Sequence, residues 1–309
     1  MEKQNKTTSI NNIGIALDAL NDLNATFKRE IICPINKAKV ITSLLKVGDD
    51  YALRTSLTSP DTFEKELSFL VYTHYTPIDN KVKPEFDDFC KFTSKNDRYV
   101  MIWSILNSTP YSKLENVKIR CPNSINKNSK CDAKEFIDNI TYDELLNENS
   151  LCIWDESQEF YDYSYPIIKK INTNKIKHIE FYTKIPSIKD RIDILSLLGI
   201  DKINHNYESI GEILSSVENL VLVTKMIRMI LTDDTAIEIN SLQELHMFII
   251  DLPITILRFI STEYSKKFDK YNPKFQKLYT CATCKEDFEY DVDIEFNLYQ
   301  SYFPGEING

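Results

Sequence analysis

The sequence contains only six glycines among its 309 residues, and it has neither a GxGxxG nor a GxxxxGK[ST] motif. Phosphate-binding loops of those types need glycines at fixed positions, so the sequence carries no signature of the nucleotide-binding folds that use them. Histidine is equally scarce, with four in the chain, and no HExxH or GxSxG motif occurs. The common metalloprotease and serine-hydrolase sites are missing, and we expect a protein that is not an enzyme.

An excess of positive charge is also absent, because 37 Lys and Arg residues face 46 Asp and Glu residues, for a net charge of −9. Nucleic-acid binding relies on clustered Lys and Arg that contact phosphates, so we expect no nucleic-acid partner. No run approaches about 20 uninterrupted apolar residues, and the first residues lack the apolar stretch of an export signal. We therefore expect an intracellular protein with no membrane partner.

Apolar residues make up 42% of the chain and include 17 Tyr and 16 Phe, enough for a sizeable core. The hydrophobic pattern predicts two strands around a turn at 34–37. Capping signals predict helices that begin near Pro60, Ser187, Ser209 and Ser241, and the helix from Ser209 is expected to reach about residue 232. The order of strands, helices, strands, helices and strands predicts an α+β fold of short antiparallel hairpins and helical segments.

Three regions are expected along the chain. We expect residues 1–28 to form an N-terminal arm that contains an amphipathic helix over 8–28. The apolar face of this helix would pack on its own domain or on a partner chain. We expect residues 29–200 to form an α+β core domain that contains the first cysteine pair. We expect residues 201–309 to form a helical region that ends in a CxxC hairpin. The acidic and aromatic segment 154–166 is interpreted as an exposed binding loop or as the tip between two strands.

Seven cysteines are present, and they are not spaced alike. Cys33, Cys90 and Cys152 stand singly among apolar neighbours, where cysteine behaves as a small buried hydrophobe. Cys281 and Cys284 form a C-x2-C pair, the spacing of a zinc knuckle. Redox proteins share this spacing, but there the pair opens a helix, whereas here it lies between two predicted strands.

The other pair, Cys121 and Cys131, has the wider spacing C-x9-C. It also follows a predicted strand, its nine intervening residues are nearly all polar, as in an inserted loop, and the sequence after Cys131 resembles that after Cys284. We expect one zinc-ribbon-like site that closes the fold, with four ligands: Cys121, Cys131, Cys281 and Cys284. Four thiolates leave zinc no open position, so the site would be structural. The alternative is two unrelated pairs, of which one or both bind no metal.

Several segments, taken in order, resemble the baseplate hub assembly proteins of T-even-like contractile-tailed bacteriophages. They are IICPINKAKVITSLL, DRYVMIWSILNSTPY, FIDNITYDELL, IEFYTKIPSIKDRIDIL, INSLQELHMFIIDLP and the final C-x2-C before YQSYF. The resemblance covers most of residues 29–303 with the order kept. The chain departs from the family in its widened first cysteine pair and in its additional helix over 8–28.

The resemblance implies a chaperone or minor component of the baseplate hub that acts by protein–protein binding. Its partners would be other hub or tail proteins, and its location the host cytoplasm during assembly or the tail baseplate of the virion. One alternative is a permanent structural subunit of the tail. Another is a zinc-ribbon regulator that binds nucleic acid or a polymerase, which would require the basic segment 169–177 to adjoin the ribbon.

Overall fold

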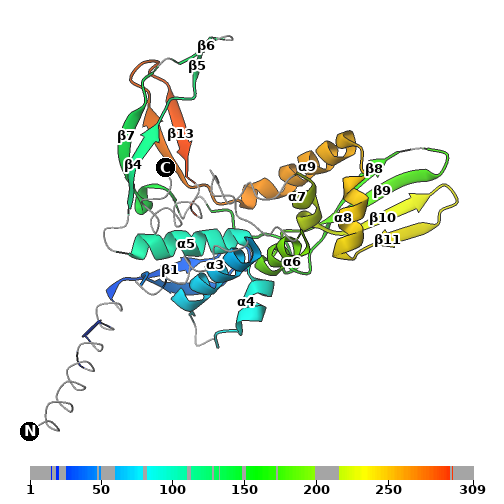
Figure 1. Ribbon diagram of the computed structural model, residues 1–309, viewed down its shortest axis with the longest axis horizontal. Coiled ribbons are helices and arrows are strands. Elements are labelled where there is room, and N and C mark those ends of the chain that lie inside the picture. The colour runs from blue at the N-terminus through cyan, green and yellow to red at the C-terminus, as the bar shows by residue number, and fades with distance from the viewer. Residues whose placement is uncertain are drawn as a thin grey trace, which may run out of the picture.

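The structure is a computed structural model in which seven α-helices and thirteen strands are described. The described residues are 26–46, 60–78, 82–109, 113–126, 129–131, 133–147, 151–171, 173–198 and 216–292, with single residues 15, 19, 20, 49 and 294. A layer of helices lies at the centre, a narrow arm of hairpins extends from one side, and a four-stranded sheet lies at the far end (Figure 1). The predicted mixture of helices with small antiparallel sheets is confirmed.

The N-terminal unit is a three-stranded antiparallel sheet covered by helices. β1 (Lys28–Ile32), β2 (Lys39–Ser43) and β3 (Tyr75–Pro77) pair in that order, and the turn predicted at 34–37 joins the first two strands. Helices α3 (Pro60–His74), α4 (Phe86–Phe92) and α5 (Lys95–Ser108) follow. The inward side chains of this sheet and these helices form about half of the largest hydrophobic cluster, which burial of apolar surface stabilises.

Three buried charged side chains connect the helices of this unit. Glu64 on α3 lies 2.5 Å from Nη1 of Arg98 on α5 and 2.9 Å from Nε of Arg191. Arg191 belongs to α6 (Ile188–Leu198), which arrives from later in the chain. Each of the three side chains is at most 4% exposed, so the carboxylate offsets charge that water cannot reach.

The far end of the molecule is a second antiparallel sheet with helices against it. Its strands lie in the order β11 (Ala236–Ile239), β10 (Thr224–Leu231), β9 (Ile176–Thr183) and β8 (Tyr165–Lys170). Helices α7 (Ser216–Val223), α8 (Leu242–Ile250) and α9 (Ile254–Phe268) complete this unit. A second hydrophobic cluster, built from these strands and helices, fills the space between them.

One predicted helix is confirmed over α7 and wrong beyond Val223. We expected helix from Ser209 to about 232, but 224–231 is β10, the strand between β9 and β11. The run LVLVTKMIRMIL is apolar at both helical and strand spacing, so its own pattern does not separate the two. Pairing of β10 with the distant strand β9 on one side and with β11, across a short turn, on the other decides the outcome. Residues 209–215 lie outside the described part of the chain.

The segment 154–166 is a loop up to the start of β8 with seven exposed residues, but two of its aromatic side chains are buried, and a binding role for it stays a prediction. Trp154 is 2% exposed and Phe160 is fully buried, within a third hydrophobic cluster that includes Phe268 and Tyr271. The segment is neither a strand nor the tip of two strands before β8 begins at Tyr165. Trp154 and Phe160 therefore serve as core, whereas Tyr161 is exposed.

The arm consists of two main hairpins and a short one at the tip (Figure 1). β4 (Lys113–Ile119) pairs with β7 (Phe136–Thr141), and β12 (Gln276–Thr280) pairs with β13 (Asp287–Asp291). Between β4 and β7, β5 (Ser124–Asn126) pairs with β6 (Ser129–Lys130). The short 3-10 helix η1 (Tyr142–Glu144) follows β7, where the chain leaves the arm. A second one, η4 (Asp269–Tyr271), follows α9 and precedes β12, where the chain returns to the arm.

Several sequence predictions concern residues outside this description. The boundary expected at residue 200 lies there, so the division into 29–200 and 201–309 stays a prediction. The helix expected over 8–28 is described only at a few positions, of which 15, 19, 20 and 26 are helical, while Lys28 already belongs to β1. Among the described residues, no helix combines the length and the apolar character needed to cross a bilayer.

Candidate metal centre

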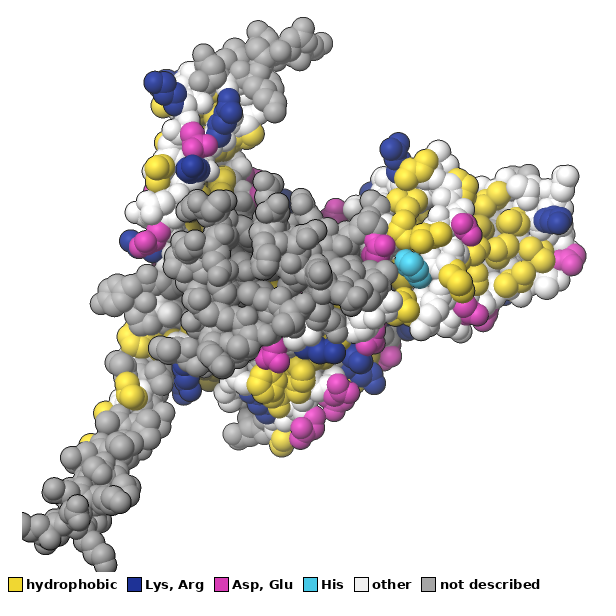
Figure 2. All heavy atoms as spheres, in the orientation of Figure 1, with side chains coloured by type: hydrophobic (Ala, Val, Ile, Leu, Met, Phe, Trp, Pro, Cys, Tyr) yellow, Lys and Arg dark blue, Asp and Glu magenta, His cyan; other side chains and the backbone are white. Residues whose placement is uncertain are grey.

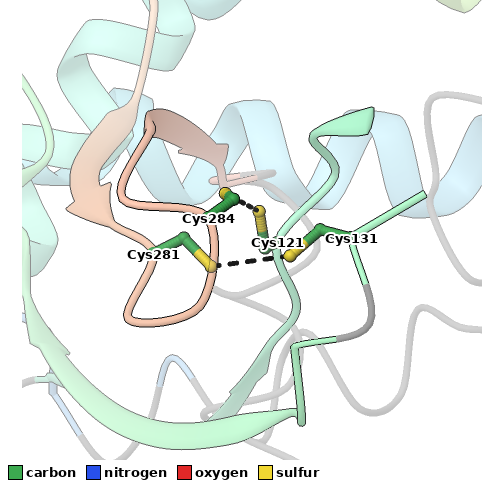
Figure 3. Close-up of side chains that lie close together, drawn as sticks. All are labelled: Cys121, Cys131, Cys281 and Cys284. Atoms are coloured by element: carbon green, nitrogen blue, oxygen red, sulfur yellow. Dashed lines mark hydrogen bonds between the residues drawn. The ribbon is translucent and has the colours of Figure 1, made fainter. Parts of the chain in front are cut away.

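Four cysteines from the two arm hairpins meet at one place (Figure 3). Cys121 lies just after β4 and Cys131 just after β6, so both come from the first hairpin and its insertion. Cys281 directly follows β12, and Cys284 lies in the turn that leads to β13. All four of the residues predicted as ligands are brought together, although about 150 residues separate the two pairs in sequence.

The spacing of the sulfur atoms fits a tetrahedral ion. Ligands at about 2.3 Å from a tetrahedral zinc lie about 3.8 Å from each other. The Sγ atoms of Cys121 and Cys284 are 3.8 Å apart, and those of Cys131 and Cys281 are 3.7 Å apart. All four lie within 4.8 Å of one another, whereas a disulfide would bring two of them to about 2.0 Å. The residues present therefore fit a metal of zinc's size and geometry.

The turn from Cys281 to Glu286 has the geometry that aims backbone amides at a sulfur. The amide of Lys285 donates to the carbonyl of Cys281 at 2.9 Å, and the amide of Cys281 donates to the carbonyl of Glu286 at 3.0 Å. Lys285 closes the turn with a φ of 63°, in the left-handed region. The amides of Cys284 and Thr283 then point at Cys281 Sγ and donate to it.

Hydrogen bonds and burial shift the pKa values of three of these thiols in different directions. The amide of Cys284, followed by that of Thr283, lowers the pKa of Cys281 to about 6. Burial raises the pKa of Cys121 to about 12 in spite of a hydrogen bond from the amide of Asn123. The amide of Ala133 lowers the pKa of Cys131, but burial and neighbouring thiols leave it above its ordinary value. A bound cation would stabilise all the thiolates, because coordination deprotonates a thiol.

Contacts between the hairpins hold the two cysteine pairs in register. Phe136 of β7 packs edge-on against Tyr279 of β12, with ring centroids 5.5 Å apart. Asp138 accepts hydrogen bonds from Tyr279 Oη at 2.8 Å and from Lys277 Nζ at 3.0 Å. Lys277 also lies 3.1 Å from Glu144, just beyond β7. The hairpins are therefore joined by aromatic and charged contacts as well as by the sulfur cluster.

The remaining three cysteines lie elsewhere. Cys33 and Cys90 are buried in the largest hydrophobic cluster, which confirms the prediction for these two. Cys152 is half-buried at the edge of the third cluster. Among the described residues, the four arm cysteines are the one group of three or more potential ligand side chains close enough to share an ion.

The turn after Cys33 repeats the backbone of the Cys281 turn without a metal. The amide of Cys33 donates to Ala38 and the amide of Lys37 donates to Cys33, while Lys37 has a φ of 58°. Asn36 stands where the second turn has Cys284. The amides of Ile35 and Asn36 donate to the carboxylate of Asp97 instead of to a sulfur. The same turn thus binds a fixed side-chain anion in the core and points at thiols in the arm.

Sequence reasoning missed Asn123, which contacts the cluster through its backbone and its side chain. Its carbonyl accepts from the amide of Cys131 at 2.7 Å, and its Nδ2 lies 3.9 Å from Cys284 Sγ. One signal in the sequence pointed toward it, namely its place two residues after Cys121, as Thr283 is placed two residues after Cys281.

The basic segment 169–177 does not adjoin the cysteine cluster. It covers the end of β8 and the start of β9, at the opposite end of the molecule from the arm (Figure 1). One of its lysines, Lys177, pairs with Asp234, and Lys169 lies over the ring of Phe259. The arrangement that would have favoured a nucleic-acid-binding ribbon is therefore not the one observed.

Comparison of the chain with protein-family models, with curated proteins and with solved structures finds no match. The cysteine geometry and the sequence resemblance are thus the two sources from which a function can be argued.

Proposed function

We propose that the chain is a binding protein without catalytic activity whose arm is closed by one structural Zn²⁺. The observation that carries this proposal is the convergence of four Sγ atoms within 4.8 Å from two hairpins distant in sequence. Zinc would be held by Cys121, Cys131, Cys281 and Cys284, and it would contribute its binding free energy to the folded state. With four thiolates the coordination shell is complete, which leaves no position for substrate or water.

Elemental analysis of protein purified without chelator or added metal tests this metal. We expect one zinc per chain in the wild type and loss of zinc in each of four variants: Cys121→Ser, Cys131→Ser, Cys281→Ser and Cys284→Ser. Cys152→Ser is the matched control, since that thiol packs against the third hydrophobic cluster and is not one of the four grouped thiols, and it should retain the metal. Retention of zinc by Cys121→Ser or Cys131→Ser would show that the site does not span both hairpins.

We further propose that the protein assists assembly of the baseplate hub of a contractile-tailed phage by binding hub or tail proteins. The ordered series of similar segments between residues 29 and 303 supports this role. Exposed apolar side chains add support, because such patches mark protein–protein contacts. Hydrophobic side chains gather over the unit of α8, α9 and the four-stranded sheet (Figure 2). On α8 and at the start of α9, Met247, Ile250 and Ile254 are each more than half exposed.

Affinity capture from phage-infected cells tests the assembly role. The tagged wild-type chain should recover hub or tail proteins identified by mass spectrometry, and Ile250→Asp should recover fewer while retaining its circular dichroism spectrum. Lys266→Asp is the control, because Lys266 is an exposed charged residue in the last turn of α9, whereas Ile254 is at its start. Recovery of no tail protein by the wild type would contradict the role.

Mass spectrometry of purified particles separates an assembly chaperone from a permanent structural subunit of the tail. A chaperone acts in the host cytoplasm and is absent from finished particles or present below one copy per hub. A stoichiometric set of peptides would instead establish the structural subunit.

A further inference from the structure

The spacing C-x9-C at Cys121 and Cys131 is wider than a two-residue knuckle, and the structure shows where the extra residues go. The carbonyl of Asn123 accepts the amide of Cys131 at 2.7 Å. Directly beyond this bond, Ser124 pairs with Lys130 as the base of the β5–β6 hairpin. The chain therefore leaves at 124 and returns at 130 to almost the same point, which brings Cys131 next to Asn123.

Without this hairpin, residues 121–123 followed by Cys131 read C-x2-C, as 281–284 do. The hydrogen bonds agree with that alignment. The amide of Asn123 donates to Cys121 Sγ, two residues before it, just as the amide of Thr283 donates to Cys281 Sγ. Asn123 thus occupies the third position of the first pair, where Thr283 stands in the second.

The side chain of Asn123 extends these contacts to the other hairpin. Its Nδ2 lies 3.9 Å from Cys284 Sγ and donates to the carbonyl of Asp287 at 3.4 Å. One residue therefore contacts three of the four cysteines, by its amide, its carbonyl and its side chain. An amide group that donates toward a thiolate orients the ligand and offsets part of its charge.

We infer that Cys121 and Cys131 form a two-residue knuckle interrupted by an extruded hairpin, with Asn123 as the residue that positions the ligands. The inference rests on the proposed metal site and adds two consequences to it. The hairpin 124–130 is dispensable for metal binding, because its sequence, SINKNSK, contains no thiol, imidazole or carboxylate and its base is closed by Asn123. The side chain of Asn123 sets the geometry and affinity of the bound metal.

Deletion of 124–130 from the full chain, which joins Asn123 directly to Cys131, tests the first consequence. Titration of the reduced, metal-free protein with Co²⁺ reports tetrahedral thiolate coordination through charge-transfer and ligand-field absorption bands. We expect one equivalent of Co²⁺ and the same bands in the deletion variant as in the wild type. Loss of the bands in the deletion variant, with the wild type unchanged, would overturn the interrupted-knuckle assignment.

Substitution of Asn123 tests the second consequence. Asn123→Asp keeps the shape but places an anion beside the Cys284 thiolate, whereas Asn123→Ala only removes the donor. We expect Zn²⁺ affinity, measured by competition with a chelator, to fall about tenfold for Ala and about a hundredfold for Asp, with shifted Co²⁺ bands. A purely structural role gives the reverse order, because Asp preserves packing better than Ala. Asn126→Asp, on the dispensable hairpin, is the control and should match the wild type.

The outcomes separate this inference from the proposed metal. If the wild-type chain binds neither Zn²⁺ nor Co²⁺, the metal proposal fails and the inference fails with it. If the wild type binds one ion but Asn123→Asp binds as tightly as Asn126→Asp, the metal proposal stands and the positioning role of Asn123 is overturned.

Discussion

Glu64 is a single carboxylate between two buried guanidinium groups, those of Arg98 and Arg191. Removing its charge leaves two arginines in the core without their shared counter-ion. We expect Glu64→Gln to lower the free energy of unfolding by about 3–5 kcal/mol, measured by urea denaturation. Glu66→Gln, on the same helix and half-buried, is the control and should change it by about 0.5 kcal/mol or less. Equal effects of the two substitutions would contradict this role.

The same carboxylate predicts a pH dependence of stability. Burial acts to raise the pKa of Glu64, but Arg191 and then Arg98 lower it from 4.5 to about 2. A depressed folded-state pKa means that its contribution is complete above about pH 4.5 and is lost as the pH falls through about 2. The difference in unfolding free energy between wild type and Glu64→Gln should therefore shrink across this window. A constant difference would show that Glu64 does not titrate with folding.

The contribution of Asp97 to the free energy of unfolding changes with pH in the opposite direction, over a neighbouring range of pH. Burial raises its pKa from 3.8 to about 6, although amides of Ile35, Ser94 and Asn36 donate to it. A raised folded-state pKa means that its contribution is greatest below about pH 3.8 and declines as the pH rises through about 6. Wild type and Glu64→Gln both contain Asp97, so its contribution cancels when their unfolding free energies are subtracted.

At the scale of elements, β10 shows how a strand is decided by its neighbours. Ile227 pairs with Phe181 of β9 and with Ile239 of β11, and it is fully buried. Ile227→Ala should lower the free energy of unfolding by about 2–5 kcal/mol. Ile237→Ala, a matched change on the exposed edge strand, should cost about 0.5 kcal/mol. Similar costs at both positions would contradict the assignment of β10 as the central buried strand.

Local signals were sufficient for elements whose ends are marked by their own residues. The cap at Ser241 is observed, with the side chain accepting from the amide of Glu244, and α3 begins at Pro60 as predicted. Features decided by distant partners could not be predicted in this way, as β10 and the burial of Trp154 and Phe160 show. The cysteines were identifiable because their chemistry is distinctive, whereas the contacts of Asn123 join it to Cys131 and Cys284 across gaps in the sequence that no local pattern spans.

At the scale of the whole molecule, the arm and the four-stranded sheet draw on different hydrophobic clusters. The arm cysteines belong to the largest cluster, and the sheet is built around the second. Chelation of the metal should therefore speed hydrogen exchange in 113–141 and 276–291, while β9 and β10 keep their protection. Mass spectrometry of peptides before and after chelation measures both. Uniform loss of protection along the chain would contradict a local role for the metal.

We propose above all that two hairpins distant in sequence supply four thiolates to one zinc ion. X-ray absorption at the zinc edge, on protein purified without added metal, tests it most directly. The geometry predicts a first shell of four sulfur atoms at about 2.3 Å and no nitrogen or oxygen ligand. A first shell with fewer than four sulfurs, or with a light-atom ligand in place of one, would contradict the claim.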